Sequence, residues 1–530
     1  MADVLENTPR RTPFAGLIVI ALSGGCSGVE GETGGSEGST GAPMVTQIRM
    51  SSLTDYRPLK AAMLTVNEDP MAELDLLNIR HIDGDYVGEY DGKAWIVFDG
   101  VPEGTYELHW RYALDPEQPD VPRPLVVMES DLGDLYTDRV YSGRPEVELA
   151  TNAATGLRLS VDNMTPLGDL DRFEVYSHNV DALGELSPYE DPGAGPLFGD
   201  TSITGWAVPW EVGSTRGRNP LVDPGAGDDL WITHQRGAYL DVQDPFDPWY
   251  DSSVYTLLEA APLDLQAMVD GVMTDTSGSF ATTPLKSLNI DLRTSEFLAE
   301  AAPSVPSPEV VECSATVSLE PGTELPVYGL LPTLGEVRSV SYTALSDRVL
   351  SFDYGNPFPV GTETLFVRCM HWQPLAHPSE GDSDYVFAFV DAAWPVAELD
   401  GGPLRPRIGS VRQVKVDGSP APVDTIRMGV GSTPTLSFEA PEVGVADLYS
   451  VRIFTVDNVL AEDESVAQSR RQVLSFATTN TSITVPEGVL EPGAFYYAQL
   501  AASTGQKLGT GRPYSHSSGV ATATTGLFTP

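Results

Sequence analysis

Three stretches near the C-terminus decide the fold: TPTLSFEAP at 433–441, LYSVRIFTV at 448–456 and LEPGAFYYAQLAA at 490–502. Apolar residues recur at every second position, as at Tyr449 and Val451. A period of two places alternate side chains on opposite faces of a strand, so these stretches predict half-buried β-strands joined by short turns.

The last stretch also contains the pattern Leu-x-Pro-Gly-x-x-Tyr, formed by Leu490, Pro492, Gly493 and Tyr496. With TSITVP at 481–486, the order and spacing resemble strands B, C, E and F of a fibronectin type III sandwich. The arrangement is also similar to C-terminal modules of secreted myxobacterial proteins of unassigned function.

The fibronectin resemblance implies a tyrosine corner, in which the Tyr496 hydroxyl bonds to the backbone at 490–492 and the ring is mostly buried. Tyr497 should point to the opposite face of the strand, because successive side chains alternate, and its hydroxyl matters little if that face is exposed. Phe438 stands where the family usually has tryptophan. That departure changes core packing and leaves the expected sandwich intact.

A second resemblance lies near the N-terminus, in DGKAWIVFDGVPEGTYELHWRY at 91–112. This segment is similar to the prealbumin-like carboxypeptidase-regulatory and collagen-adhesin B-type repeats. The matching positions are Asp91, Gly92, Phe98, Val101, Pro102, Gly104 and Tyr106. The resemblance implies a further β-sandwich over residues 45–150.

The whole chain is predicted to be all-β, with tandem β-sandwich domains, because no long stretch shows apolar spacing of 3.6 residues. Pro-rich breaks at 301–309 and 401–407 suggest domain boundaries. The expected units are a signal peptide (1–25), a tether (26–44), a prealbumin-like sandwich (45–150), a β-rich, loop-heavy domain (151–302), a sandwich (303–404) and a fibronectin type III-like domain (405–530).

The N-terminus has the features of an export signal. Arg10 and Arg11 precede an apolar run at 14–22, which is too short to span a bilayer. The small residues before Cys26 resemble a bacterial lipobox, which implies lipid attachment at Cys26, and Ser27 then implies delivery to the outer membrane. The alternative is an ordinary signal peptide and an extracellular protein. Residues 27–43 contain almost no large apolar residue and predict a flexible tether.

Cysteine parity supports that reading, because lipidation of Cys26 leaves Cys313 and Cys369 as an even pair in an oxidising compartment. We expect a disulfide between them. Two free buried thiols are one alternative. A zinc site that uses Cys369 and His371 is another, since alternate residues share a face of a strand.

The charge restricts the partners. With 31 Lys and Arg against 75 Asp and Glu, the formal net charge is −44. Such a surface repels phosphate backbones and anionic headgroups, so we expect no nucleic-acid partner and contact with a membrane only through the lipid anchor.

Two further groups of residues are candidate binding sites. Asp83, Asp85, Glu89 and Asp91 resemble an oxygen-ligand loop for calcium, although the spacing fails the EF-hand pattern, and a solvated acidic loop is the alternative. Trp206, Trp210, Trp231 and Trp249 fall in a loop-rich region, where exposed rings would stack on a carbohydrate or protein ligand. Their alternative role is as large side chains of a core.

Catalytic motifs are missing from the sequence. A G-x-S-x-G match at 34–38 lies in the expected tether, away from any strand-to-helix turn. We therefore expect no catalytic residues and no required cofactor. The leading function is a non-catalytic cell-surface lipoprotein for binding, adhesion or envelope structure. The alternative is a secreted glycoside-type hydrolase that uses paired carboxylates in 151–302. Those carboxylates would line an enclosed acidic pocket.

Overall fold

The structure is a computed structural model that describes residues 46–57, 63–66, 74–81, 84–90, 96–102, 104–112, 123–130, 134–142, 144, 147–180, 182–188, 195–212, 219–241, 252–320, 332–341, 345–358, 361–375, 385–460, 466–505 and 518–530. The fold is all-β, as predicted. One α-helix, α2 (Thr294–Ala301), and two 3-10 turns, η1 (Pro224–Ala226) and η3 (Val396–Glu398), accompany the strands in these ranges. No helix within them is long and apolar enough to cross a membrane.

One nineteen-stranded sheet, the long sheet, runs through most of the molecule. Its strands, in the order in which neighbours pair, are β12 (Ala182–Leu186), β11 (Arg172–Ser177), β14 (Trp231–Asp241), β15 (Ser252–Pro262), β21 (Thr333–Ser341), β20 (Val310–Glu320), β23 (Thr362–Pro374), β24 (Tyr385–Pro395), β34 (Gly519–Thr524), β33 (Phe495–Thr504), β30 (Leu448–Leu460), β31 (Val466–Thr478), β8 (Leu125–Ser130), β7 (Tyr106–Tyr112), β3 (Leu74–His81) and β4 (Gly84–Val87). Three short strands attach at its sides, namely β18 (Ala281–Thr282), β28 (Ile426–Met428) and β35 (Leu527–Thr529).

In the described part of the chain, four smaller sheets accompany the long sheet. The first contains β1 (Thr46–Arg57), β2 (Met63–Val66), β5 (Glu89–Tyr90), β6 (Ile96–Val101) and β9 (Asp134–Ser142). The second contains β10 (Gly156–Asp162), β13 (Ile203–Pro209), β16 (Asp264–Leu265) and β17 (Met273–Ser279). The third contains β19 (Leu285–Leu292), β22 (Arg348–Gly355) and β25 (Pro403–Leu404), and the fourth contains β26 (Arg412–Val416), β27 (Ser419–Pro420), β29 (Thr435–Glu439) and β32 (Ser482–Thr484).

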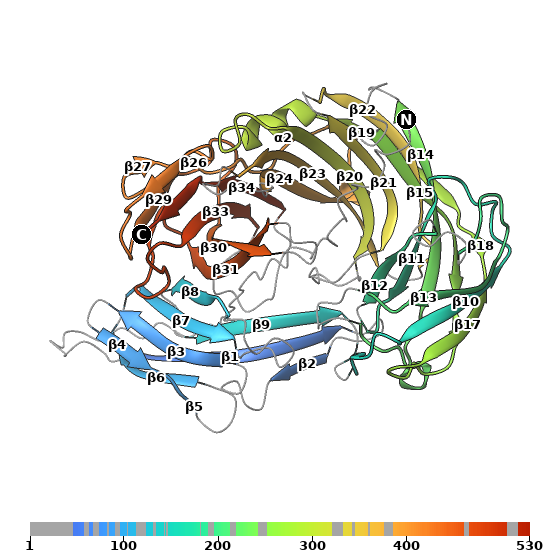
Figure 1. The fold of residues 1–530 in the computed structure, drawn as a ribbon, viewed down its shortest axis with the longest axis horizontal. Helices are drawn as coiled ribbons and strands as arrows, with labels where there is room; N and C mark the ends of the chain where they lie inside the picture. The colour runs from blue at the N-terminus through green and yellow to red at the C-terminus, as the bar shows by residue number, and fades with distance from the viewer. Residues whose placement is uncertain are drawn as a thin grey trace, which may run out of the picture.

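The two larger cores of the described chain combine residues of the long sheet with residues of the smaller sheets. In Figure 1 the long sheet follows an arc, with β19, β22 and α2 along its outer side. Alternate residues of β20, such as Ala315 and Val317, are fully buried in the same core as Phe297 of α2. A second core contains Leu159 of β10 and Phe173 of β11. It combines residues of β10 and β13, in the second smaller sheet, with residues of β11 and β14, in the long sheet. Where one face of a strand is covered, as in β10, along which buried and exposed side chains alternate, the period of two in the sequence marks that face.

The opposite face of the long sheet carries ion pairs. Arg172 contacts Glu336 at 3.0 Å, Arg338 contacts Glu312 at 2.7 Å and Arg368 contacts Asp391 at 2.6 Å. Arg368 and Asp391 stand directly opposite each other on β23 and β24. Three arginines of this face are therefore paired with carboxylates within the sheet.

Backbone pairing passes across the ranges expected for separate domains. Tyr255 of β15 pairs with Glu336 of β21, and Val390 of β24 pairs with Ala521 of β34. The N-terminal strand β8 lies parallel to β31, with Val127 opposite Phe476. The domain division remains a prediction, and neighbouring units share hydrogen bonds along the long sheet.

The predicted disulfide is present. Cys313 and Cys369 are directly opposed on the antiparallel strands β20 and β23, with their Cα atoms 4.1 Å apart. Both side chains are buried in the main core. The bond therefore joins two central strands of the long sheet and closes a loop over a sequence separation of 56.

The tyrosine corner has the predicted geometry at Tyr496. Its ring is 2% exposed, and its hydroxyl accepts a hydrogen bond of 2.8 Å from the backbone N–H of Glu491. Tyr497 lies on the opposite face of β33, as predicted, and that face is not exposed. That ring is buried in a separate small core and stacks on Phe454 at 5.1 Å, because this side of β33 is also covered.

Replacement of Tyr496 by Phe should lower the free energy of unfolding by about 1–3 kcal/mol, because the Glu491 N–H loses its buried acceptor while the ring remains. Tyr497→Phe should cost less, since it keeps the stacked ring and the hydroxyl that it removes accepts a long hydrogen bond, 3.5 Å, from Arg470. Denaturant midpoints of the full chain measure both losses. Equal losses would mean that the corner hydrogen bond does not stabilise this region.

Candidate functional site

The tryptophans proposed for ligand stacking are mainly core residues. Trp206 and Trp210 are 5% and 3% exposed and belong to the core between β10 and β11. Trp210 donates its indole N–H to the carbonyl of Pro220 at 2.9 Å. The binding interpretation of these two residues is therefore corrected to the core alternative, since no ring face is open to a ligand.

Trp231 is half-buried and packs against Phe358, outside the core that holds Trp206 and Trp210. Its ring meets Phe358 edge to face at 5.5 Å, and Phe358 meets Tyr176 at 5.4 Å. The indole N–H donates to Asp229 at 2.9 Å. Trp231 therefore packs the segment after β22 against β11 and β14. Trp249 lies outside the described residues.

The metal-site candidates gain no support from the described residues. Asp85 is exposed and lies 4.0 Å from Arg80, and Glu89 is also exposed, while Asp83 and Asp91 lie outside the described ranges. Within those ranges no group of three or more His, Cys, Asp or Glu side chains could hold a metal ion. The calcium interpretation stays a prediction.

The zinc alternative is overturned, because the disulfide removes the thiolate of Cys369. His371 is buried, and its Nδ1 lies 3.2 Å from the carbonyl oxygen of Val305. Burial lowers the pKa of this imidazole despite that contact. His371 is therefore a neutral core side chain near physiological pH.

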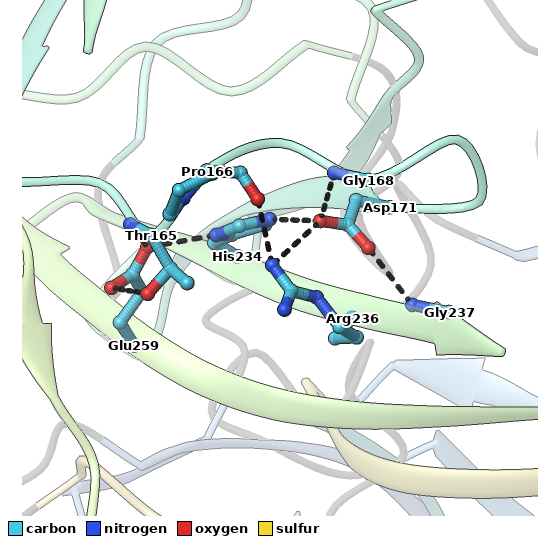
Figure 2. A network of polar contacts seen from close by, with 8 residues as sticks. All are labelled: Thr165, Pro166, Gly168, Asp171, His234, Arg236, Gly237 and Glu259. Carbon is cyan, nitrogen blue, oxygen red and sulfur yellow. Dashed lines mark hydrogen bonds and ion pairs between the residues drawn. The ribbon is translucent and has the colours of Figure 1, made fainter. Parts of the chain in front are cut away.

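The most unusual polar group in the described chain is a buried histidine between two carboxylates. His234 of β14 lies with Nε2 2.9 Å from Asp171 Oδ2 and with Nδ1 2.8 Å from Glu259 Oε1 (Figure 2). The side chains of His234 and Asp171 are 0% exposed, and that of Glu259 is 3% exposed. Both ring nitrogens face carboxylate oxygens, which fits an imidazolium that donates from both positions.

Each carboxylate is held by further donors. Glu259 accepts from the backbone N–H and the hydroxyl of Thr165, at 2.7 and 2.8 Å. Asp171 accepts from the backbone N–H groups of Gly168 and Gly237, at 2.7 and 3.1 Å. No side chain fits at Gly237, since an added Cβ would lie 2.3 Å from the carbonyl oxygen of Leu170. The network thus joins the 165–171 loop to β14 and β15.

The pKa directions match a charged bridge. Burial alone would lower the pKa of His234, but the hydrogen bonds to Asp171 and Glu259 outweigh burial and raise it above 6.5. Burial would raise the pKa of each carboxyl group, whereas the hydrogen bonds from His234 and from the loop hold both below their usual values. Arg236, 3.4 Å from Asp171, adds positive charge.

This network is suited to holding structure together. Its imidazole and carboxylates are already hydrogen-bonded and are sealed beneath Phe173, whose ring centroid lies 5.0 Å from that of His234. A general acid or base needs to reach a substrate proton. No local sequence motif marks the network, because Asp171 and His234 stand 63 residues apart.

An open cavity lies elsewhere, at the junction of β8 and β31. It encloses about 440 Å³ and is lined by Arg80, Thr105, Tyr106, Glu107, Glu129, Phe476, Asn480, Ser482, Ile483 and Thr484. Glu129 bridges the two sides, because it accepts hydrogen bonds from the Thr478 hydroxyl and the Asn480 amide. The cavity therefore sits between the N-terminal and C-terminal parts of the chain and outside residues 151–302.

Comparisons with known proteins add little. No protein-family model and no curated protein matches the chain. Among solved structures, one described as "The Bacillus anthracis TIE protein" is similar at 9% identity over 87% of this chain and 70% of that one. Its TM-score is 0.10, so the likeness carries no argument about fold or function.

The bridge predicts a stability maximum in weakly acidic solution. Because the pKa of His234 is raised in the folded state, the stability that this residue contributes is fully present below pH 6.5. That stability is lost as the pH rises through the pKa of the folded state. Because the pKa values of Asp171 and Glu259 are lowered in the folded state, the stability that these residues contribute is present above about pH 4. That stability is lost as the pH falls through their folded-state pKa values.

His234→Gln should abolish the alkaline decline and lower the free energy of unfolding by about 3–5 kcal/mol near pH 6, because two buried carboxylates lose their cation. His371→Gln is the matched control and should keep the alkaline decline. Urea unfolding between pH 4 and 9 measures both. An alkaline decline that persists in His234→Gln would contradict the charged bridge.

Proposed function

We propose that the protein is a non-catalytic, exported binding or envelope-structural protein, tethered to the outer membrane by lipid on Cys26. The observation that carries the proposal is the state of Asp171 and Glu259. These two carboxylates of the 151–302 region are buried and hydrogen-bonded to His234. Its Nε2 lies 2.9 Å from Asp171 Oδ2 and its Nδ1 lies 2.8 Å from Glu259 Oε1. The carboxylates support a rigid frame and offer nothing to a substrate.

The hydrolase alternative is weaker for the same reason. Glycoside hydrolysis needs two carboxyl groups on either side of a substrate, separated by about 5–10 Å and open to it. Asp171 and Glu259 face a shared imidazolium with their side chains buried. The open cavity of about 440 Å³ lies at the β8–β31 junction and favours ligand binding.

The family resemblances fit this proposal. The Tyr496 corner and the edge-to-face contact of Phe438 with Tyr449 at 5.0 Å support a fibronectin type III-like domain at 405–530. Such sandwiches, like the prealbumin-like unit proposed at 45–150, serve as spacers and binding modules in many surface proteins. A lipid anchor and a Gly/Ser/Glu tether would hold them away from the membrane.

The proposed function predicts retention without turnover. The exported chain carrying Cys26→Ser, mixed with purified bacterial envelopes, chitin or cellulose, should sediment saturably with at least one of them and should release no reducing ends. Asp171→Asn and Glu259→Gln serve as controls. Release of sugar that either substitution abolishes would establish the hydrolase, and absence of retention on every surface would contradict the binding role.

The anchor has its own test. In cells fed a fatty-acid analogue, the wild-type protein should take up label and Cys26→Ser should take up none, because the thiol is the attachment point. Cys313→Ser/Cys369→Ser is the control and should label as the wild type does. Undiminished label on Cys26→Ser would contradict lipid attachment at this residue.

A further inference from the structure

The cavity at the β8–β31 junction opens where these two strands part. Their parallel pairing ends at Met128 and Ala477, after which the chain turns through 479–481 into β32. β8 itself continues through Glu129 to Ser130. The cavity thus has one wall made by β3, β7 and β8 and another made by β32.

β32 presents a free strand edge to this cavity. Among the strands of the described residues it pairs with β29 alone, through Ser437–Ser482, Leu436–Ile483 and Thr435–Thr484. Thr481 and Val485 supply backbone hydrogen bonds toward the β29 side, at 3.0 Å each. Because antiparallel ladders alternate, the N–H and C=O groups of Ser482 and Thr484 point to the other side. Within the described chain these groups have no backbone partner.

The facing wall carries a row of charged side chains in register. Arg80 of β3 is opposite Glu107 of β7, and Glu107 is opposite Glu129 of β8. Two carboxylates directly opposed across a strand pair repel each other and destabilise a sheet. Glu107 Oε2 lies 2.8 Å from His109 Nε2. In the contacts of the described chain, Glu129 is bonded only to neutral groups, those of Thr478 and Asn480. A cation entering the cavity would relieve this repulsion.

We propose that this cavity binds an extended peptide segment with a basic side chain, which pairs with the free edge of β32 and directs its cation toward Glu107 and Glu129. Addition of a strand to an open edge takes affinity from main-chain hydrogen bonds and selectivity from side-chain pockets. The inference rests on the proposed binding function and names the class of ligand.

The walls favour a peptide over a saccharide. Tyr106 and Phe476 line the cavity but are each 2% exposed, so neither offers an open ring face for stacking on a sugar. The Ser482 and Thr484 side chains are exposed and flank the free backbone groups. Backbone pairing and charge are therefore the recognition chemistry available here.

The test uses an acetylated, amidated heptapeptide of alternating threonine and valine with lysine at its centre, titrated into the full exported chain carrying Cys26→Ser. A partner of an edge strand uses every second amide. Two further peptides are N-methylated at the two alternate sets of amides. One of them should bind like the parent, and the other should bind at least about tenfold more weakly.

Substitutions test the charged wall. Glu107→Gln should weaken the lysine peptide several-fold and leave a version with alanine at its centre unchanged. Glu487→Gln, which removes an exposed carboxylate outside the cavity, is the matched control and should change neither. The inference would be overturned if the two methylation patterns had equal effects or if the parent peptide did not bind. It would also be overturned if mixed chitin and cellulose oligosaccharides bound to the chain and the peptide did not. Retention on envelopes would then still stand as evidence for the proposed function.

Discussion

The pairing of β8 with β31 is the constraint on which the arrangement of the molecule depends. Parallel strands cannot be joined by a tight turn, and here the paired residues are more than half the chain apart, with Leu125 beside Leu474. This contact places the N-terminal unit beside the C-terminal one. With β15–β21 and β24–β34, it carries backbone hydrogen bonding from β12 to β4 without interruption.

A second link holds the other side of the N-terminal unit. Arg144, just after β9, donates two hydrogen bonds to the buried carboxylate of Asp228, at 2.8 and 3.0 Å. The backbone N–H of Arg144 bonds to the carbonyl of Asn179. Figure 1 shows β1 and β9 extending from the β3–β7 region toward β12. The N-terminal unit is thus fixed at both ends, which suits a frame that presents its junction cavity in a constant shape.

The sequence predicts well what depends on neighbours along the chain. The period of two at Tyr449 and Val451 predicted a strand that the structure contains. The pattern ending at Tyr496 predicted its hydrogen bond to the backbone, and cysteine parity predicted the Cys313–Cys369 disulfide. Trp206 shows the limit of that reasoning, because a loop-like composition says little about burial when the rings themselves build the core. The Asp171–His234–Glu259 bridge and the β8–β31 pairing join distant segments, and only the folded topology brings those residues together.

Hydrogen exchange at 474–477 tests the β8–β31 pairing most directly. β31 pairs with β30 on one side and with β8 on the other, so alternate amides of this segment bond to different strands. With β8 in place, every amide from Leu474 to Ala477 should be protected to a similar degree in the full exported chain. If every second amide exchanged at the rate of an open edge strand, β8 would not be paired there, and the account of a continuous sheet with a junction cavity would fail.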